Sequence, residues 1–191
     1  MKIIDISREV FTAPVYDSDP KPQFRWFKNI RGGDDYNLSV IGITTHTGTH
    51  IDAPRHYIQG AESIDNIDLK KCYGSCTVIT IEGILTGEDM DNLLPHCKKR
   101  LLIHGNGNAA LSLSAARVIT DNGLLLVGID SVSIAYENEE EVHKELLSHG
   151  TLILENICLD DVRDGNYILS ACPLKLGGLE AAPARAVLIS K

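Results

Sequence analysis

The stretch from Thr45 to His56 reads THTGTHIDAPRH and carries four side chains that can bind a metal ion or transfer a proton, His46, His50, Asp52 and His56. All four occupy even positions, so a pleated strand would turn them to one face. A straight strand would hold the first two histidines roughly 13 Å apart, at about 3.3 Å of rise per residue. Two imidazoles on one zinc ion need bonds of about 2.0–2.1 Å each. The backbone of this stretch must therefore bend.

Glycine and proline indicate where the bend lies. Three β-branched threonines and Gly48 disfavour a helix, so we predict a strand that kinks at Gly48. Pro54 favours an extended Ala53, which lets His56 return toward the same pocket. Imidazole and carboxylate groups without thiolate suit zinc, manganese or ferrous iron better than calcium or magnesium. A lone histidine in a strand is usually structural, but three with an aspartate favour a metal site.

Composition narrows the class of protein. The 191 residues, 43% of them hydrophobic, predict one domain over residues 1–191 with a substantial core. A net charge of −8 disfavours nucleic acid and anionic membranes as partners and favours a small-molecule substrate. The sequence has neither a signal-peptide pattern nor eighteen consecutive apolar residues, so we expect a cytoplasmic protein. Five scattered cysteines without CxxC spacing indicate reduced thiols, mostly in the core.

Strand patterns outnumber helix patterns in the rest of the chain. We expect strands at 2–7, 38–45, 76–82, 100–104, 123–130 and 151–155, with two more near the C-terminus. We expect helices after Thr86, over 114–120, and from Asn138 to about Ser148, with Asn138 and Glu141 resembling a capping box. The predicted fold class is α/β or mixed α+β, with mixed sheets.

The segment from Thr12 to Arg31 is predicted to be a long loop, because three prolines interrupt it. Loops of this length are usually functional or disordered, and its aromatic residues argue against disorder. In one interpretation it forms a pocket wall in which Tyr16 and Trp26 bind a flat substrate. In the other, its aromatic residues anchor it to the core or to another subunit.

A second pair of candidate ligands lies in the later part of the chain. His143 shares a helix face with Leu146 and Leu147, three and four residues on, and therefore points inward. Glu155 ends an apolar strand, where a buried carboxylate is costly unless it is paired or bound to a metal. Each alone would more often be structural. Together with the four residues of the histidine-rich stretch they favour one shared site, whereas His149 at the helix end receives no role.

The stretch HTGTHIDAPRHY resembles the HxGTHxDxPxHF signature of the metal-dependent cyclase or arylformamidase-like family, which includes bacterial kynurenine formamidases and isatin hydrolases. PVYDSDP and GIDSVSI resemble two further segments of that family, and CPLKLGGLEAAPARAVLI follows its C-terminal pattern. The histidine-to-glutamate spacing from His143 to Glu155 also matches. The resemblance covers essentially the whole chain.

The resemblance implies a swivelling β/β/α fold, a homodimer or homotetramer, and two divalent ions, zinc or else manganese. It implies that the first ion is bound by His46, His50 and Asp52. Asp52 would also bridge to a second ion, which is bound by His143 and Glu155.

The resemblance further implies that His56 is the catalytic proton shuttle and that Tyr16 lies next to the substrate. Three departures concern the substrate rather than the chemistry: DSD replaces PGD after Tyr16, Tyr57 replaces phenylalanine, and GGLEAAP lacks an aspartate-glycine pair.

The predicted reaction is hydrolysis of the C–N bond of a small amide, such as an N-formyl aryl amine, by metal-activated water. A hydrolase of a cyclic amide or of another small carbonyl compound that uses manganese is the alternative enzyme. A metal-dependent binding protein without turnover is the alternative outside enzymes, and purely structural ions rank last because structural zinc sites usually use cysteine and histidine. Neither a GxSxG nor an HExxH motif is present.

Overall fold

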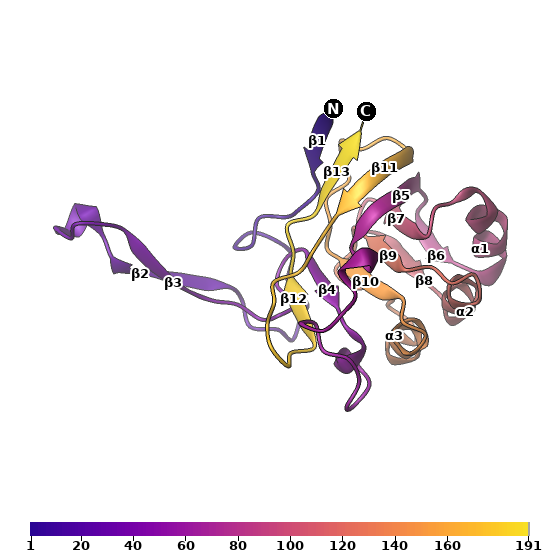
Figure 1. Cartoon of the computed structure of the whole chain (residues 1–191), viewed down its shortest axis with the longest axis horizontal. Coiled ribbons are helices and arrows are strands. Elements are labelled where there is room, and N and C mark those ends of the chain that lie inside the picture. Colours follow the sequence, from indigo (N-terminus) through magenta and orange to yellow (C-terminus); the bar gives the residue numbers. More distant parts are fainter. Residues whose placement is uncertain (191) are drawn as a thin grey trace.

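The structure, a computed structural model that describes residues 1–190, is built on one curled nine-stranded sheet (Figure 1). The strand order is β1-β13-β11-β5-β7-β9-β10-β4-β12. These strands are β1 Lys2–Asp5, β4 His50–Asp52, β5 Tyr73–Thr80, β7 Arg100–His104, β9 Leu126–Ile129, β10 Leu152–Glu155, β11 Gly165–Ser170, β12 Ala181–Pro183 and β13 Val187–Ser190. The predicted mixed α+β class is confirmed.

The centre of the sheet is parallel and its two flanks are antiparallel. Strands β5, β7, β9 and β10 run parallel to one another, whereas β4 pairs antiparallel with both β10 and β12. The sequences of the parallel strands are continuous apolar runs because both faces of these strands are covered. Strand β7, for example, is buried along its whole length.

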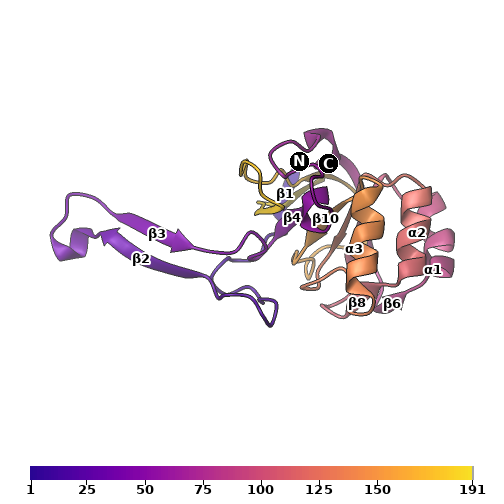
Figure 2. The same cartoon turned by 90° about the horizontal axis from the view of Figure 1, so that it is seen from below.

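Three helices cover one face of the sheet (Figure 2). They are α1 Gly87–Leu93, α2 Leu113–Asp121 and α3 Glu139–Ser148. Short strands β6 Gly83–Leu85 and β8 Ala109–Leu111 pair in parallel beside them. A second apolar core fills the opposite face of the sheet, around Ile51 and Leu154. None of the helices within residues 1–190 has the length and apolar character needed to cross a membrane.

The sequence predicts the N-terminal cap of α1 correctly and that of α3 incorrectly. Thr86 caps the start of α1, as predicted, and it also forms a capping box with Asp89. The predicted capping box at Asn138 is wrong. Asn138 adopts a left-handed conformation with φ 50°, and its side chain makes no capping hydrogen bond. Three glutamates in the first turn of α3 favour the positive end of the helix dipole instead.

Residues 20–42 form a protruding hairpin, called the arm below, that extends away from the sheet in both views (Figures 1 and 2). It consists of β2 Gln23–Lys28, a 3₁₀ turn at Ile30–Gly32 and β3 Leu38–Gly42. The prediction of an irregular loop over residues 12–31 is therefore wrong for its second half. Pro20 and Pro22 precede β2 rather than interrupt it, so the strand keeps all its backbone donors.

Candidate metal centre

The histidine-rich stretch bends at the predicted position, but the bend is a turn rather than a kink within one strand. Strand β3 ends at Gly42, residues 45–49 form a turn, and β4 begins at His50. Gly48 has φ 65°, a left-handed conformation that glycine adopts without steric cost. As a result the rings of His46 and His50 lie 4.8 Å apart, measured between centroids, instead of the separation a straight strand would impose.

Asp52 lies at the centre of the cluster and is fully buried. Its Oδ1 atom is 3.0 Å from Nδ1 of His46 and 3.4 Å from Nε2 of His50. Its Oδ2 atom is 4.0 Å from Nε2 of His143. One carboxylate therefore faces three imidazoles that come from two distant parts of the chain.

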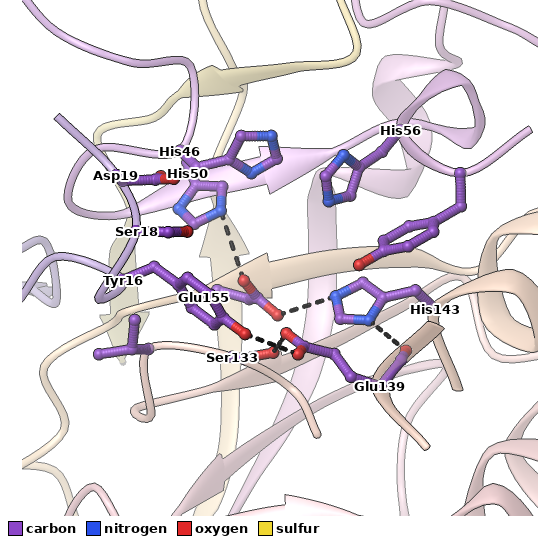
Figure 3. Close-up of a pocket in the computed structure, with 12 residues that line it drawn as sticks. Tyr16, Ser18, Asp19, His46, His50, His56, Ser133, Glu139, His143 and Glu155 are labelled. Carbon is purple, nitrogen blue, oxygen red and sulfur yellow. Dashed lines mark hydrogen bonds and ion pairs between the residues drawn. The ribbon is translucent and has the colours of Figure 1, made fainter. Parts of the chain in front are cut away.

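Glu155 completes the buried cluster from β10 (Figure 3). The antiparallel register places it directly opposite His50 on β4. Its Oε2 atom is 3.4 Å from Nε2 of His50, and its Oε1 atom is 3.4 Å from Nε2 of His143. Oε1 also accepts a hydrogen bond of 2.6 Å from the backbone N–H of Ile134, which fixes the carboxylate in place.

The donor set fits divalent cations. Nε2 of His50 and both carboxylate oxygens of Asp52 are buried without a hydrogen-bond partner, which is rare for buried polar atoms. Possible ligand atoms gather in two groups, and the atoms within each group lie within 4.8 Å of one another. One group is His46, Asp52 and His56, and the other is His50, Asp52 and Glu155. Asp52 belongs to both groups. His56 lies as close to Asp52 as a ligand would.

Backbone carbonyls orient two of the imidazoles. Nδ1 of His50 lies 2.8 Å from the carbonyl oxygen of Gly48, and Nδ1 of His143 lies 2.7 Å from that of Glu139. A donor at Nδ1 leaves Nε2 of each ring free to face the carboxylates. This arrangement, with the second nitrogen held by a carbonyl, is typical of metal-binding histidines.

The two carboxylates control the protonation of these histidines in the absence of an ion. Burial by itself lowers the pKa of His50, but Asp52 and Glu155 outweigh it and raise that pKa to about 10. Burial likewise lowers the pKa of His143, and Glu155 and Asp52 raise it to about 9. Burial alone would raise the pKa of Asp52, yet the charges of His46 and His50 hold it well below its usual range.

His56 lies on the wall of the site, on the 3₁₀ turn Pro54–His56. Its ring centroid is 4.3 Å from that of His46 and 5.8 Å from that of His143. Burial lowers its pKa, and the neighbouring His46 and His143 lower it further, whereas Asp52 raises it. The ring of Tyr57, the next residue, lies 4.8 Å from that of His143.

A cavity of about 210 Å³ opens onto the cluster. Its walls include Tyr16, whose hydroxyl donates a hydrogen bond of 2.9 Å to Glu139, and Ser133, which donates one of 2.7 Å to the other oxygen of the same carboxylate. The structure thus places Tyr16 in the pocket. It does not bring Trp26 there, because Trp26 lies on β2 of the arm and is 52% exposed.

Glu139 and Glu180 belong to the site and were missed by sequence reasoning. Glu139 precedes His143 by one helical turn, a spacing that is visible in the sequence. Glu180 accepts a hydrogen bond of 2.5 Å from Thr45 and lies 3.6 Å from Nε2 of His46. It belongs to GGLEAAP, so the segment that departs from the expected pattern carries a carboxylate to the site.

Comparison with known proteins identifies the family. The family model described as putative cyclase matches residues 4–136, which is more than half of the chain. The chain belongs to the putative cyclase family. The membership that the histidine signature predicts is therefore confirmed.

Relatives of this cyclase-family protein align over nearly the whole chain. It is 35% identical to the kynurenine formamidase of Delftia acidovorans, over 98% of this chain and 97% of that protein. It is 31% identical to the kynurenine formamidase of Bacillus cereus, over 97% and 96%.

Solved structures share the fold. A potential metal-dependent hydrolase with cyclase activity matches with a TM-score of 0.84 at 30% identity, over 98% of this chain and 96% of that one. Isatin hydrolase A from Labrenzia aggregata matches with a TM-score of 0.83 at 19% identity, over 100% and 94%, which shows a common fold.

Proposed function

We propose that this cyclase-family protein is a metal-dependent hydrolase that cleaves the C–N bond of a small amide, such as an N-formyl aryl amine. The observation that carries the proposal is the buried carboxylate of Asp52, which has no hydrogen-bond partner, faces three imidazoles and lies beside a cavity. The similarity to two kynurenine formamidases favours a formyl amide as the substrate.

Two divalent ions, zinc or manganese, would be held by His46, His50, Asp52, His143 and Glu155. Such ions would lower the pKa of a bound water toward about 7 and polarise a substrate carbonyl. The protein's own contribution is to keep the donor atoms dry and oriented, through burial of Asp52 and the carbonyl contacts of His50 and His143.

His56 is the proposed proton shuttle. An amide needs a proton on its leaving nitrogen, and an imidazole can accept a proton from water and return it. His56 is partly exposed at the wall of the cavity, so its ring can contact the substrate as well as the buried cluster. Tyr16 and Tyr57 line the same cavity and supply aromatic surface for a flat ring.

The proposed place of action is the cytoplasm. All five cysteines are free, and Cys72 and Cys76 are buried thiols with no disulfide partner. Proteins that work in reducing compartments keep their thiols in this form.

The deciding experiment is an assay of metal-loaded and chelator-treated protein with N-formylkynurenine, with isatin as a cyclic amide in parallel. We expect metal-dependent hydrolysis of the formyl amide. Faster cleavage of isatin would indicate that the substrate is a cyclic amide rather than a formyl amide. Metal-loaded protein that hydrolyses neither substrate would contradict the proposed function.

Variants separate metal binding from proton transfer. Asp52→Ala should lose bound metal and activity together, because both groups of ligand atoms share Asp52. His56→Ala should keep its metal and lose activity by about 10²–10⁴-fold, the usual contribution of general acid–base catalysis. His149→Ala, which changes an exposed histidine outside the site, is the control. A His56→Ala protein that binds less metal would make His56 a ligand instead.

A further inference from the structure

The cavity beside the metal centre carries acidic side chains and lacks basic ones. Asp19 and Glu139 line it in addition to Glu155, which belongs to the buried cluster. Among residues 1–190, neither a lysine nor an arginine lines it. Its histidines are the candidate metal ligands and the proposed proton shuttle. A substrate carboxylate would therefore meet no lysine or arginine on the wall of the cavity.

The carboxylate of Glu139 is held in place from both sides (Figure 3). Its Oε2 atom accepts a hydrogen bond of 2.9 Å from the hydroxyl of Tyr16, and its Oε1 atom accepts one of 2.7 Å from Ser133. Ser133 is 2% exposed and is therefore a fixed part of the wall. The hydrogen bond to Glu139 raises the pKa of Tyr16 above its ordinary value, so the phenol keeps its proton and remains a donor. The carboxylate is thus oriented before a ligand binds.

The two hydroxyl groups leave Glu139 with unused capacity to accept hydrogen bonds. A carboxylate offers about four acceptor positions, of which Tyr16 and Ser133 use one on each oxygen. Glu139 is partly exposed and borders the cavity, so a ligand can reach the remaining positions. An ammonium group supplies three donors, and hydrogen bonds from a charged donor to a carboxylate are roughly twice as strong as neutral ones. Glu139 is therefore suited to bind an amine.

The position of Glu139 on α3 places this carboxylate close to the metal centre. Glu139 precedes His143 by one helical turn, a spacing at which the Cβ atoms lie about 5–6 Å apart. The backbone carbonyl oxygen of Glu139 also lies 2.7 Å from Nδ1 of His143. A group bound to the side chain of Glu139 therefore lies about one helical turn from a candidate metal ligand.

We infer that Glu139 binds an ammonium group of the substrate, and that the preferred substrate is a formylated aryl amine whose side chain ends in an amine and carries no carboxylate. This assignment rests on the proposed function, because it takes the cavity as the substrate pocket. The formyl group faces the metal centre while the ammonium group donates to Glu139 beside the hydroxyl of Tyr16. A carboxylate in the same place would face Glu139 and Asp19, and such like-charge contacts discriminate against the wrong ligand.

Binding of three product-like ligands tests the inference without turnover. The first is the neutral ortho-aminophenyl ethyl ketone, and in the other two an ammonium group or a carboxylate replaces one terminal hydrogen of its ethyl group. We expect the ammonium ligand to bind the metal-loaded protein about 10–100-fold more tightly than the neutral ketone, as hydrogen bonds to a charged group allow. The carboxylate ligand should bind more weakly than the ammonium ligand. Isothermal titration calorimetry at pH 7 measures all three affinities.

Glu139→Gln isolates the charge of this side chain. Glutamine keeps its shape and can still form hydrogen bonds with Tyr16 and Ser133, but it carries no charge. We expect the variant to lose the preference for the ammonium ligand and to keep its affinity for the neutral ketone and its metal content. With the formylated ammonium compound as substrate, the variant should change KM rather than kcat, because Glu139 does not contact the reacting group.

Glu141→Gln is the matched control. It removes the same charge two residues further along α3, from an exposed side chain that does not line the cavity. The preference for the ammonium ligand should remain in this variant. An equal loss in Glu141→Gln and Glu139→Gln would overturn the inference, because the effect would then come from the general charge of the protein.

Two further outcomes would overturn the inference. The first is an ammonium ligand that binds the unmodified protein no more tightly than the neutral ketone or the carboxylate ligand. The second is a preference for the ammonium ligand that survives Glu139→Gln. Failure of the proposed function is distinguishable, because a protein that prefers the ammonium ligand yet hydrolyses no formyl amide supports the amine site and contradicts the hydrolase. Hydrolysis without this preference overturns the amine site alone.

Discussion

Asp52 shows how one residue determines the character of the site. A buried carboxylate is costly unless it is paired, and here three imidazoles lie within 4.0 Å of the carboxylate oxygens. The surrounding sequence supports this residue: Gly48 makes the turn that brings His46 and His50 together, and Pro54 starts the 3₁₀ turn that carries His56.

Gly48→Ala should weaken metal binding and lower the free energy of unfolding by about 1 kcal/mol, because alanine resists a left-handed conformation. Its Cβ atom would meet nothing closer than 3.7 Å, so the effect is one of backbone conformation. Metal affinity should fall because the Gly48 carbonyl orients His50. Calorimetric metal titration and urea unfolding measure the two effects.

Gly123→Ala is the matched control. Gly123 has φ 60°, has open space around it and lies next to α2, away from the site. It should cost similar stability and leave metal affinity unchanged. Equal metal affinity in both variants would show that the turn at Gly48 does not position the ligands.

Burial should make the cysteines react unequally. Burial raises the pKa of the Cys72 and Cys76 thiols to about 12, and the thiolate is the reactive form. Cys172 is exposed. Brief treatment with iodoacetamide at pH 8 should therefore alkylate Cys172 and spare the two buried thiols, as peptide mass spectrometry would show. Labelling of Cys72 as fast as Cys172 in the folded protein would contradict the assigned burial.

At the scale of elements, the short strand β4 depends on its neighbours. It has three residues, and it is held between β10 and β12 by antiparallel pairing on both sides. The register on the β10 side places His50 opposite Glu155. A slip by one residue would turn Glu155 to the other face of the sheet and break the site.

Gly128→Ala tests how tightly the sheet and its covering layers pack. An alanine Cβ on β9 would lie 2.5 Å from Cδ2 of Leu102, which is fully buried on β7 and cannot move aside freely. We expect a loss of about 1–3 kcal/mol in the free energy of unfolding, measured with urea. Leu102→Ala alone should cost about 2–5 kcal/mol. The double variant should cost less than the sum, and strict additivity would refute the clash.

The sequence predicts most of the central sheet and the location of the metal ligands, because apolar runs and closely spaced histidines are local signals. It does not predict the arm, since prolines and exposed aromatic residues resemble a loop when no core face shows the period of a strand. Glu180 was missed because it reaches Thr45 across 135 positions. The helix α3 begins and ends where the sequence predicts, but the capping box at its start was mispredicted, because Asn138 adopts a left-handed conformation and its side chain forms no cap.

At the scale of the whole molecule, the metal site concentrates buried charge inside an acidic protein. Four of its ionisable side chains, His50, Asp52, His143 and Glu155, are buried. Without ions, the histidines must balance the carboxylates by holding protons. With ions, those protons leave, because metal ligands must be deprotonated.

The stability of the chelator-treated protein should therefore fall as pH rises. The folded-state pKa values of His50, about 10, and His143, about 9, exceed the unfolded value of 6.5. Their stabilising contribution is complete below pH 6.5 and is lost as pH rises through about 9 and 10. The advantage of the metal-loaded protein should grow over the same range.

Urea unfolding of both forms at several pH values measures this effect. Asp52→Asn removes a principal cause of the raised pKa values and should flatten the profile of the metal-free protein. A metal-free protein whose stability stays level or rises between pH 6.5 and 9 would refute the proposed charge balance.

The pairing of strands across the whole chain also sets an order of events during synthesis. Strand β4 has no partner until residues 152–155 and 181–183 have been made, and β1 pairs with β13, which is made last of the strands. The histidine-rich stretch is therefore synthesised before the strands that hold it in place. Metal capture at the complete site therefore follows the synthesis of residues 181–183, and the pairing of such distant segments is slow.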